Sequence, residues 1–135
     1  MLKCVYKSPP IENAKKHTDS NVASVWRLIC PGPNNDWPLG LCDWRTVDIE
    51  DDIIDNDVVF EGNATENTLL YYNRKHQWYW KSDMGMDDVI VLCNASSDGR
   101  LRARAFHTAF EVPQYSPDIK DLRHSIEVRV AAFLR

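Results

Sequence analysis

The sequence lacks three features that would assign it to a membrane, nucleic-acid-binding or secreted protein. It has no apolar run of the roughly 18 residues that a membrane-spanning helix needs. Its formal net charge is −4, with 16 Lys and Arg against 20 Asp and Glu, so it has no basic excess with which to neutralise phosphates. Its first residues contain no apolar stretch of the kind found in secretory signals. We therefore expect a cytoplasmic protein that binds neither membranes nor nucleic acid.

The cysteines also lack the spacing of a metal or redox site. The four cysteines are Cys4, Cys30, Cys42 and Cys93, and none of them forms a CxxC pair or a zinc-finger pattern. In a reducing compartment such residues stay as thiols and behave as small buried apolar side chains. We expect four reduced, structural cysteines.

The chain of 135 residues has the length of a single domain. Residues 1–21 are mostly polar, include the pair Pro9-Pro10 and show no apolar period, which predicts a flexible lead-in before a domain at 22–135. That domain holds short segments of β-branched and aromatic residues separated by turn formers, at 67–72, 77–80, 89–93, 102–110 and 125–130. The pattern predicts an all-β, mainly antiparallel barrel or jelly roll.

Four segments allow more specific predictions. The apolar run Val89–Cys93 is typical of a strand that is buried on both faces. Residues 125–130 alternate, with Ile126, Val128 and Val130 on one face of a strand. The acidic stretch Asp48–Asp57 predicts a solvated loop, and Met84–Val89 predicts at most a single helical turn.

The sequence contains five tryptophans. Trp37, Trp44, Trp78 and Trp80 either pack in the core or line a pocket, and we favour the core. Exposed rings would instead fit an aromatic-lined sugar-binding protein.

Most of the candidate chemistry lies near the C-terminus. His107 lies in an apolar strand segment, where a histidine is more often a core residue than a ligand. Sixteen residues later, Arg123 and Ser125 lie two positions apart at the start of an alternating strand, so both can reach one carboxylate. Non-haem iron oxygenases use this order, with a last histidine ligand and then an Arg-x-Ser anchor for 2-oxoglutarate. Alternatively, Arg123 pairs with a surface acid such as Glu127 or Asp121.

These residues belong to a longer, collinear set that runs from about residue 22 to the C-terminus. The set comprises Val25-Trp-Arg27, Asp36-Trp-Pro-Leu-Gly-Leu-Cys-Asp43, Arg45-Thr-Val-Asp48, Tyr72-Asn73, His76-Gln-Trp-Tyr79, Met86-Asp-Asp-Val89, Asp98-Gly-Arg100, His107-Thr-Ala-Phe110 and Arg123-His-Ser-Ile-Glu-Val-Arg129. On these stretches the chain resembles the fungal AsaB-type hydroxylase/desaturase family, which includes gibberellin desaturase-like and cephem methoxylase-like proteins. The resemblance implies a double-stranded β-helix that uses Fe(II), 2-oxoglutarate and O₂ to hydroxylate or desaturate a small molecule of secondary metabolism.

The resemblance also implies roles for individual residues. His107 matches the distal iron ligand, and Arg123 with Ser125 matches the 2-oxoglutarate anchor. His17-Thr-Asp19 is a nominal match to the other two iron ligands, but Asp19 stands only seven residues before Trp26, closer than the family places its pair.

The short N-terminal side of the chain leaves two interpretations open. The chain is the C-terminal portion of such an oxygenase, with an incomplete β-helix and exposed strand edges that favour association. Alternatively, it is a non-catalytic β-helix remnant that binds a small acid or a partner protein. The substrate and the oligomeric state are not encoded in any motif.

Overall fold

The computed structural model describes residues 2–4, 19–96, 105–115, 118 and 122–134. Within these ranges every named element is a strand except one short 3₁₀ turn, η2 (Trp44–Thr46). The strands are β1 (Leu2–Cys4), β2 (Asp19–Leu28), β3 (Leu39–Cys42), β4 (Ile53–Phe60), β5 (Asn63–Leu70), β6 (Trp78–Tyr79), β7 (Ile90–Ser96), β8 (His107–Ala109) and β9 (Ser125–Leu134). None of the described helices is long and apolar enough to cross a membrane.

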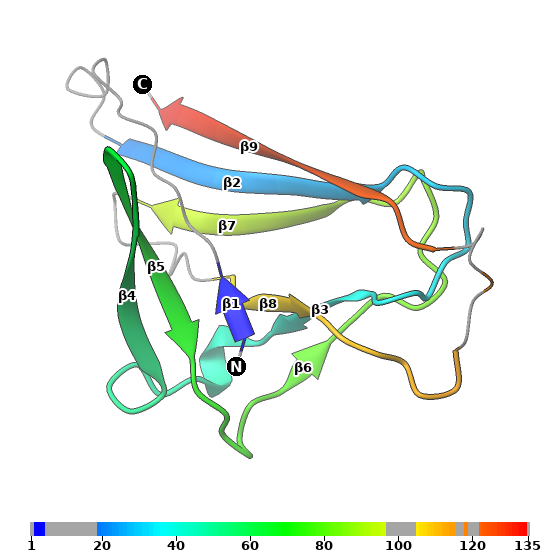
Figure 1. Ribbon diagram of the computed structural model, residues 1–135, viewed down its shortest axis with the longest axis horizontal. Helices are drawn as coiled ribbons and strands as arrows, with labels where there is room; N and C mark the ends of the chain where they lie inside the picture. The colour runs from blue at the N-terminus through cyan, green and yellow to red at the C-terminus, as the bar shows by residue number, and fades with distance from the viewer. Residues whose placement is uncertain (1, 5–18, 97–104, 116–117, 119–121, 135) are drawn as a thin grey trace.

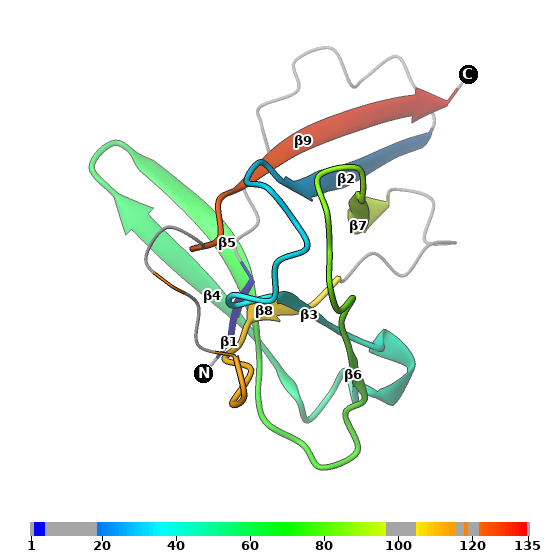
Figure 2. The same cartoon turned by 90° about the vertical axis from the view of Figure 1, so that its right-hand side faces the viewer.

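The strands form three antiparallel sheets of three strands each. Their orders are β7-β2-β9, β6-β3-β8 and β1-β5-β4. The long β7-β2-β9 sheet lies opposite the short β6-β3-β8 sheet, and the β4–β5 hairpin extends away from both (Figures 1 and 2). The expected all-β, mainly antiparallel fold is confirmed.

The principal core fills the space between the two opposed sheets. Its centre is Leu28, which is 2% exposed because alternate residues of β2 point toward β3. The buried members are Trp26, Leu28, Cys30, Leu39, Met84 and Leu92, with Leu41, Ile90 and Ala105 packed against them. Burying each of the larger side chains stabilises the fold by roughly 1.5–3 kcal/mol.

A second, smaller core lies on the other side of β3. Cys42, Leu70 and Phe106 are buried together there, with Val47 and Ile53 against them. Because Leu41 packs on the first core and Cys42 on the second, the β6-β3-β8 sheet is a middle layer between β2 and β5. Cys30, Cys42 and Cys93 are thiols, as expected, and burial raises the pKa of the Cys42 thiol.

Four expectations from the sequence differ from the structure. Much of the acidic Asp48–Asp57 stretch is not a solvated loop, because β4 begins at Ile53 and Asp52 is buried. The segment Met84–Val89 has a single hydrogen-bonded turn, from the Asp88 N–H to the Gly85 carbonyl, which is not a helix, and Met84 makes an isolated antiparallel bridge with Asn34. Within the expected lead-in 1–21, residues 2–4 and 19–21 lie in strands, and residues 5–18 are outside the described residues. The expectation that Val89–Cys93 is buried on both faces is wrong for the outer face, where Val91 is 66% exposed.

Candidate functional site

The segment that carries Arg123 is held against the loop between β2 and β3. The backbone N–H of Arg123 donates to Asp36 Oδ2 at 2.8 Å, and the Ile29 N–H donates to the His124 carbonyl at 2.9 Å. The guanidinium of Arg123 donates through Nη1 to the carbonyl of Trp37 and lies 5.7 Å from the centroid of the Trp26 ring. Burial lowers the pKa of Arg123, although this group stays protonated at any physiological pH.

Arg123 and Ser125 both face the interior. Ser125 is the first residue of β9 and lies opposite Leu28 of β2. Residues directly opposite in an antiparallel pair project to the same side, and Leu28 points into the principal core. Arg123, two residues earlier, contacts Trp26 on that same side. The pair therefore has the shared orientation that the sequence predicted.

His107 faces the same interior from the opposite sheet. It begins β8 and lies opposite Leu41, which packs against the principal core. Its Nδ1 is 2.6 Å from the Ala105 carbonyl oxygen, which can only accept, so Nδ1 carries a proton and the Nδ1–H tautomer has its lone pair at Nε2. Metal-binding histidines are commonly oriented by such a hydrogen bond from their second nitrogen to a backbone carbonyl.

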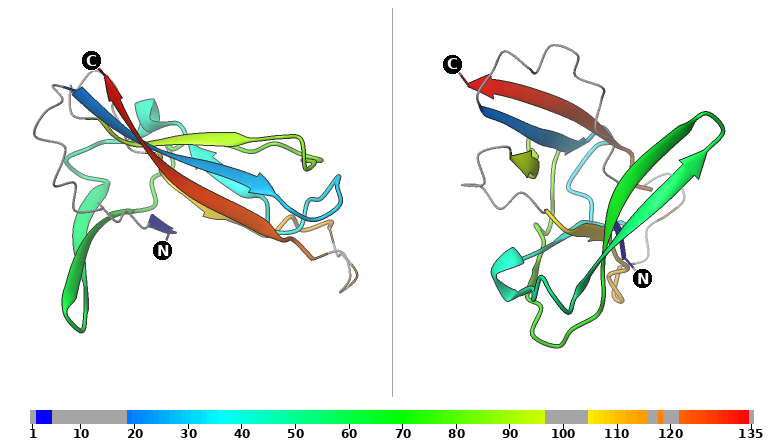
Figure 3. Two further views of the ribbon diagram at one scale, coloured as in Figure 1. Left: turned by 90° about the horizontal axis from the view of Figure 1, so that it is seen from above. Right: turned by 90° about the vertical axis from the view of Figure 1, so that its left-hand side faces the viewer.

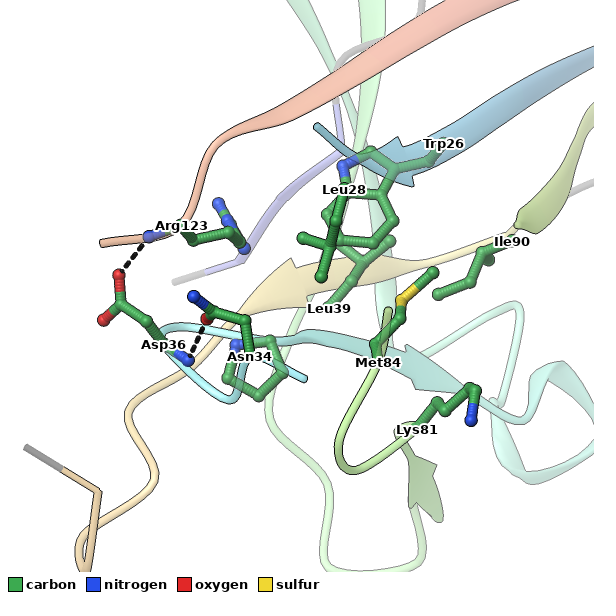
Figure 4. Close-up of a pocket in the computed structure, with 10 residues that line it drawn as sticks. Trp26, Leu28, Asn34, Asp36, Leu39, Lys81, Met84, Ile90 and Arg123 are labelled. Atoms are coloured by element: carbon green, nitrogen blue, oxygen red, sulfur yellow. Dashed lines mark hydrogen bonds between the residues drawn. The ribbon is translucent and has the colours of Figure 1, made fainter. Parts of the chain in front are cut away.

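The interior beside Arg123 is nearly filled. Figure 4 shows Arg123, Asp36 and Asn34 at one side of a small cavity, with Met84, Ile90 and Lys81 on the opposite side. The lining residues are Trp26, Leu28, Asn34, Asp36, Pro38, Leu39, Lys81, Met84, Ile90 and Arg123. The cavity volume is about 10 Å³, which is space for one water molecule. A dicarboxylate therefore reaches the guanidinium through this cavity only if the side chains that line it move apart.

The structure does not bring a complete metal-binding group together among its described residues. No set of three His, Cys, Asp or Glu side chains there is placed to hold an ion. His17 is outside the described residues, and Asp19 lies opposite Leu134 at the first position of β2. That position is nine residues from Leu28, which is about 30 Å along a strand. The match of His17 and Asp19 to two iron ligands stays a prediction.

A buried histidine–carboxylate pair was missed by the sequence analysis. His76 lies in a polar turn of the sequence, but its side chain is 2% exposed and its Nε2 is 2.9 Å from Asp52 Oδ2. Asp52 also accepts hydrogen bonds from Asn73 Nδ2 and from the Asp48 N–H, both at 2.9 Å. The hydrogen bond from Asn73, then that from Asp48 and the contact with His76, lower the pKa of Asp52 to about 2.

Most of the tryptophans are also placed differently from the expectation. Trp26 is buried, whereas Trp37, Trp44, Trp78 and Trp80 are between 36% and 51% exposed, so the preference for core packing is wrong for these four. Trp80 packs edge-on against Phe110, with 5.5 Å between ring centroids. Trp37 has a positive φ of 44°, an uncommon conformation for a bulky residue, and its carbonyl accepts from Arg123.

Comparison with known proteins assigns this chain to a family. The family described as Oxidoreductase/YMDC permease-like domain matches residues 5–133, almost the whole chain. The chain belongs to this family. The resemblance to AsaB-type enzymes is confirmed by the hydroxylase/desaturase asaB of Aspergillus flavus, which is 29% identical over 126 residues, covering 83% of this chain and 54% of that protein.

Two further relatives are named as a dioxygenase and a desaturase. The Fe(II)/2-oxoglutarate-dependent dioxygenase nvfI of Aspergillus novofumigatus is 32% identical over 111 residues, covering 82% of this chain and 39% of that protein. The gibberellin cluster GA4 desaturase of Gibberella fujikuroi is 30% identical over 104 residues, covering 71% of this chain and 30% of that protein. The chain thus spans about half the length of these relatives, or less.

A solved structure confirms the fold class. The iron and alpha-ketoglutarate-dependent endoperoxidase NvfI superimposes with a TM-score of 0.73 at 26% identity, covering 92% of this chain and 47% of that one. This chain therefore has the jelly-roll fold of such oxygenases, and it corresponds to about half of the NvfI chain.

Proposed function

We propose that this chain provides the distal iron ligand and the 2-oxoglutarate anchor of an oxidoreductase that hydroxylates or desaturates a small molecule of secondary metabolism. The names of its relatives, which include a hydroxylase/desaturase and an Fe(II)/2-oxoglutarate-dependent dioxygenase, support this assignment. The cytoplasmic location expected from the sequence stays a prediction.

One observation carries the proposal. His107 on β8 and Arg123 with Ser125 at the start of β9 face one interior from opposite sheets. The hydrogen bond between His107 Nδ1 and the Ala105 carbonyl presents Nε2 as the metal-binding atom. The planar fork of Arg123 can bind the distal carboxylate of 2-oxoglutarate through two parallel hydrogen bonds, and the Ser125 hydroxyl can add a third.

The residues fit these two roles but do not make a complete iron site. Non-haem Fe(II) oxygenases use two histidines and one carboxylate, and the described part of the chain supplies only His107. With 2-oxoglutarate and O₂, bound iron supplies the oxidising chemistry for an unactivated C–H bond. The contribution of this chain is to orient the co-substrate and to exclude water with the apolar wall around Leu28 and Leu39.

A second candidate function is supported by the filled interior. The cavity beside Arg123 holds about one water molecule, and Arg123 is already bound to the Trp37 carbonyl. A remnant of this fold that binds a small acid or a partner protein without turnover would need neither a wider cavity nor further metal ligands.

Anaerobic titration of the purified chain with Fe(II) and 2-oxoglutarate separates the two functions. If His17 and Asp19 supply the other two iron ligands, the proposed function predicts a weak, saturable visible charge-transfer band that is lost in His107→Ala and kept in the exposed control His124→Ala. Calorimetry should show at least about tenfold weaker 2-oxoglutarate binding in Arg123→Ala, since a bidentate charged contact is removed. The control Arg45→Ala removes an exposed guanidinium that pairs with Asp43 and should leave the affinity unchanged.

Either of two results would contradict the proposal for this chain. One is the absence of a band in protein that circular dichroism shows to be folded. The other is equal 2-oxoglutarate affinity in Arg123→Ala and the wild type. Binding of the acid without a band would favour the non-catalytic alternative.

A further inference from the structure

Two consecutive residues of the loop between β2 and β3 hold Arg123 at both of its ends. Asp36 Oδ2 accepts the backbone N–H of Arg123 at 2.8 Å, and the carbonyl of Trp37 accepts from Nη1 of the same residue. The loop runs beside the start of β9, at one end of the two opposed sheets (Figures 1 and 3). One hydrogen bond therefore fixes the backbone of Arg123, and the other fixes its guanidinium.

These two residues are themselves fixed within the fold. The Asp36 N–H donates to Asn34 Oδ1 at 2.7 Å, so the backbone of Asp36 is held as well as its carboxylate (Figure 4). On the other side, the carbonyl of Pro38 accepts the Phe110 N–H at 3.3 Å, which continues the pairing of β3 with β8. The dipeptide thus connects the Arg123 segment to the sheet that carries the candidate iron ligand.

The backbone of Trp37 is strained. Its φ of 44° lies in the left-handed region, which bulky residues seldom adopt, and the following Pro38 further narrows the conformations open to it. Burial of the ring does not account for the strain, because Trp37 is 51% exposed. The strained turn instead carries the carbonyl that binds Arg123. Strain of this kind is concentrated at functional sites, where a required geometry outweighs its cost.

The two hydrogen bonds leave one edge of the guanidinium for a ligand. Trp37 binds Nη1, and the carbon at the centre of the guanidinium lies 5.7 Å from the centroid of the Trp26 ring. Nε and Nη2 make no hydrogen bond to any residue that the structure describes. Two such N–H groups on one edge are the donors that bind a carboxylate through parallel hydrogen bonds. A guanidinium that is already oriented loses less freedom when the carboxylate binds, so its affinity is higher.

We propose that Asp36 and Trp37 are positioning residues, which hold the Arg123 guanidinium in the orientation that binds the distal carboxylate of 2-oxoglutarate. Asp36 acts through an acceptor oxygen and Trp37 through its backbone carbonyl, and neither role requires contact with the co-substrate. The identity of the ligand rests on the proposed function. The hold on Arg123 does not, because it can be measured without a ligand.

NMR of the ¹⁵N-labelled chain without ligand measures this hold. The side-chain signals of Arg123 are assigned by their loss in Arg123→Lys. A held guanidinium rotates slowly about its C–N bonds, so the Nη protons should be resolved in the wild type. Asp36→Ala should merge them, whereas Asp36→Asn keeps an acceptor oxygen and should keep them resolved. The control Asp57→Ala removes an exposed carboxylate on β4 and should change nothing.

Two substitutions at Trp37 separate the role of its backbone from that of its ring. Trp37→Gly and Trp37→Val both remove the ring, but glycine adopts a positive φ readily and a β-branched residue does not. Trp37→Gly should therefore keep the resolved Arg123 signals, and Trp37→Val should lose them. Because Trp37 is half exposed, circular dichroism should show both variants to be folded, which keeps the test decisive if Asp36→Ala does not fold.

Anaerobic calorimetry in the presence of Fe(II) measures the consequence for binding. The two ligands are 2-oxoglutarate and 2-oxobutyrate, which lacks the distal carboxylate. Asp36→Ala and Trp37→Val should bind 2-oxoglutarate roughly two- to tenfold more weakly than the wild type, the worth of one hydrogen bond, and 2-oxobutyrate equally well. Asp36→Asn and Trp37→Gly should restore the preference for 2-oxoglutarate. A loss of folding alone would weaken the binding of both acids.

Three results would overturn the proposal. The first is Arg123 signals that are the same in the wild type, Asp36→Ala and Trp37→Val. The second is a Trp37→Gly variant that releases Arg123 as fully as Trp37→Val does. The third is an Asp36→Ala variant that keeps the wild type's preference for 2-oxoglutarate. A wild type that holds Arg123 through these residues but binds no 2-oxoglutarate would instead contradict the proposed function, and with it the ligand named here, while confirming the hold on Arg123.

Discussion

Replacing Asp52 by alanine removes the carboxylate that joins the loop after β3 to the turn before β6. Asp52 Oδ2 contacts His76 Nε2 and accepts from the Asp48 N–H, and Oδ1 accepts from Asn73 Nδ2. The side chains of Asp52 and His76 are 6% and 2% exposed, so little water can replace the lost partner. The substitution therefore leaves three donors without their acceptor in a nearly closed space.

The expected loss of stability follows from these contacts. A buried donor without a partner costs about 1–3 kcal/mol, and a hydrogen bond to a charged group contributes about 1.5–3 kcal/mol. We expect Asp52→Ala to lower the free energy of unfolding by about 3–5 kcal/mol. Asp52→Asn keeps an acceptor oxygen toward one donor and should cost about half as much. Asp57→Ala removes an exposed carboxylate on β4 and should change stability by less than about 0.5 kcal/mol.

Urea denaturation followed by tryptophan fluorescence measures the three variants against the wild type. The midpoint should fall in the order Asp57→Ala, Asp52→Asn, Asp52→Ala, with an unchanged slope. The reasoning is refuted if Asp52→Ala is as stable as Asp57→Ala, because the buried pair would then contribute nothing.

Three further predictions concern pH and packing. Because the fold lowers the pKa of Asp52 to about 2, the ionised carboxylate stabilises the folded state, and this contribution is fully present above the unfolded pKa of 3.8. It should disappear as the pH falls from 3.8 to about 2, and acid titration of Asp52→Asn should lack this dependence. Gly32→Ala should lower the melting temperature, at a cost of about 1–3 kcal/mol, because its Cβ would lie 2.8 Å from Gly85 Cα. Gly85→Ala should melt like the wild type, since its Cβ meets nothing closer than 3.9 Å. Leu28→Ala should cost about 2–5 kcal/mol in urea denaturation, against little change for Leu122→Ala, whose side chain is 42% exposed.

The strands were predictable where β-branched and aromatic residues cluster between turn formers. The segments 67–72, 77–80, 89–93 and 125–130 all contain strand residues, in β5, β6, β7 and β9. Strand β4 was not predictable, because its sequence begins within an acidic run and its stability comes from pairing with β5 and from burial of Asp52. Tertiary contacts here outweigh a local composition that favours a loop.

The candidate site was predictable only in part. The two-residue spacing of Arg123 and Ser125 correctly predicted that the two residues lie on the same side of the sheet. No local pattern could show that the Arg123 guanidinium binds the Trp37 carbonyl, because that contact joins segments 86 residues apart. The Asp52–His76 pair was hidden for the same reason, since the two side chains are 24 residues apart and each is surrounded by polar neighbours.

Strand β9 shows what the periodicity of a sequence can and cannot determine. Alternation places Ile126, Val128 and Val130 on one face, and this is correct. It does not say which face points inward, because that depends on what each face meets in space. Here the polar residue Ser125 lies opposite the buried Leu28, on the interior side of the sheet. The polar face of β9, not the apolar one, therefore lies on the side of the sheet that carries the proposed anchor residues.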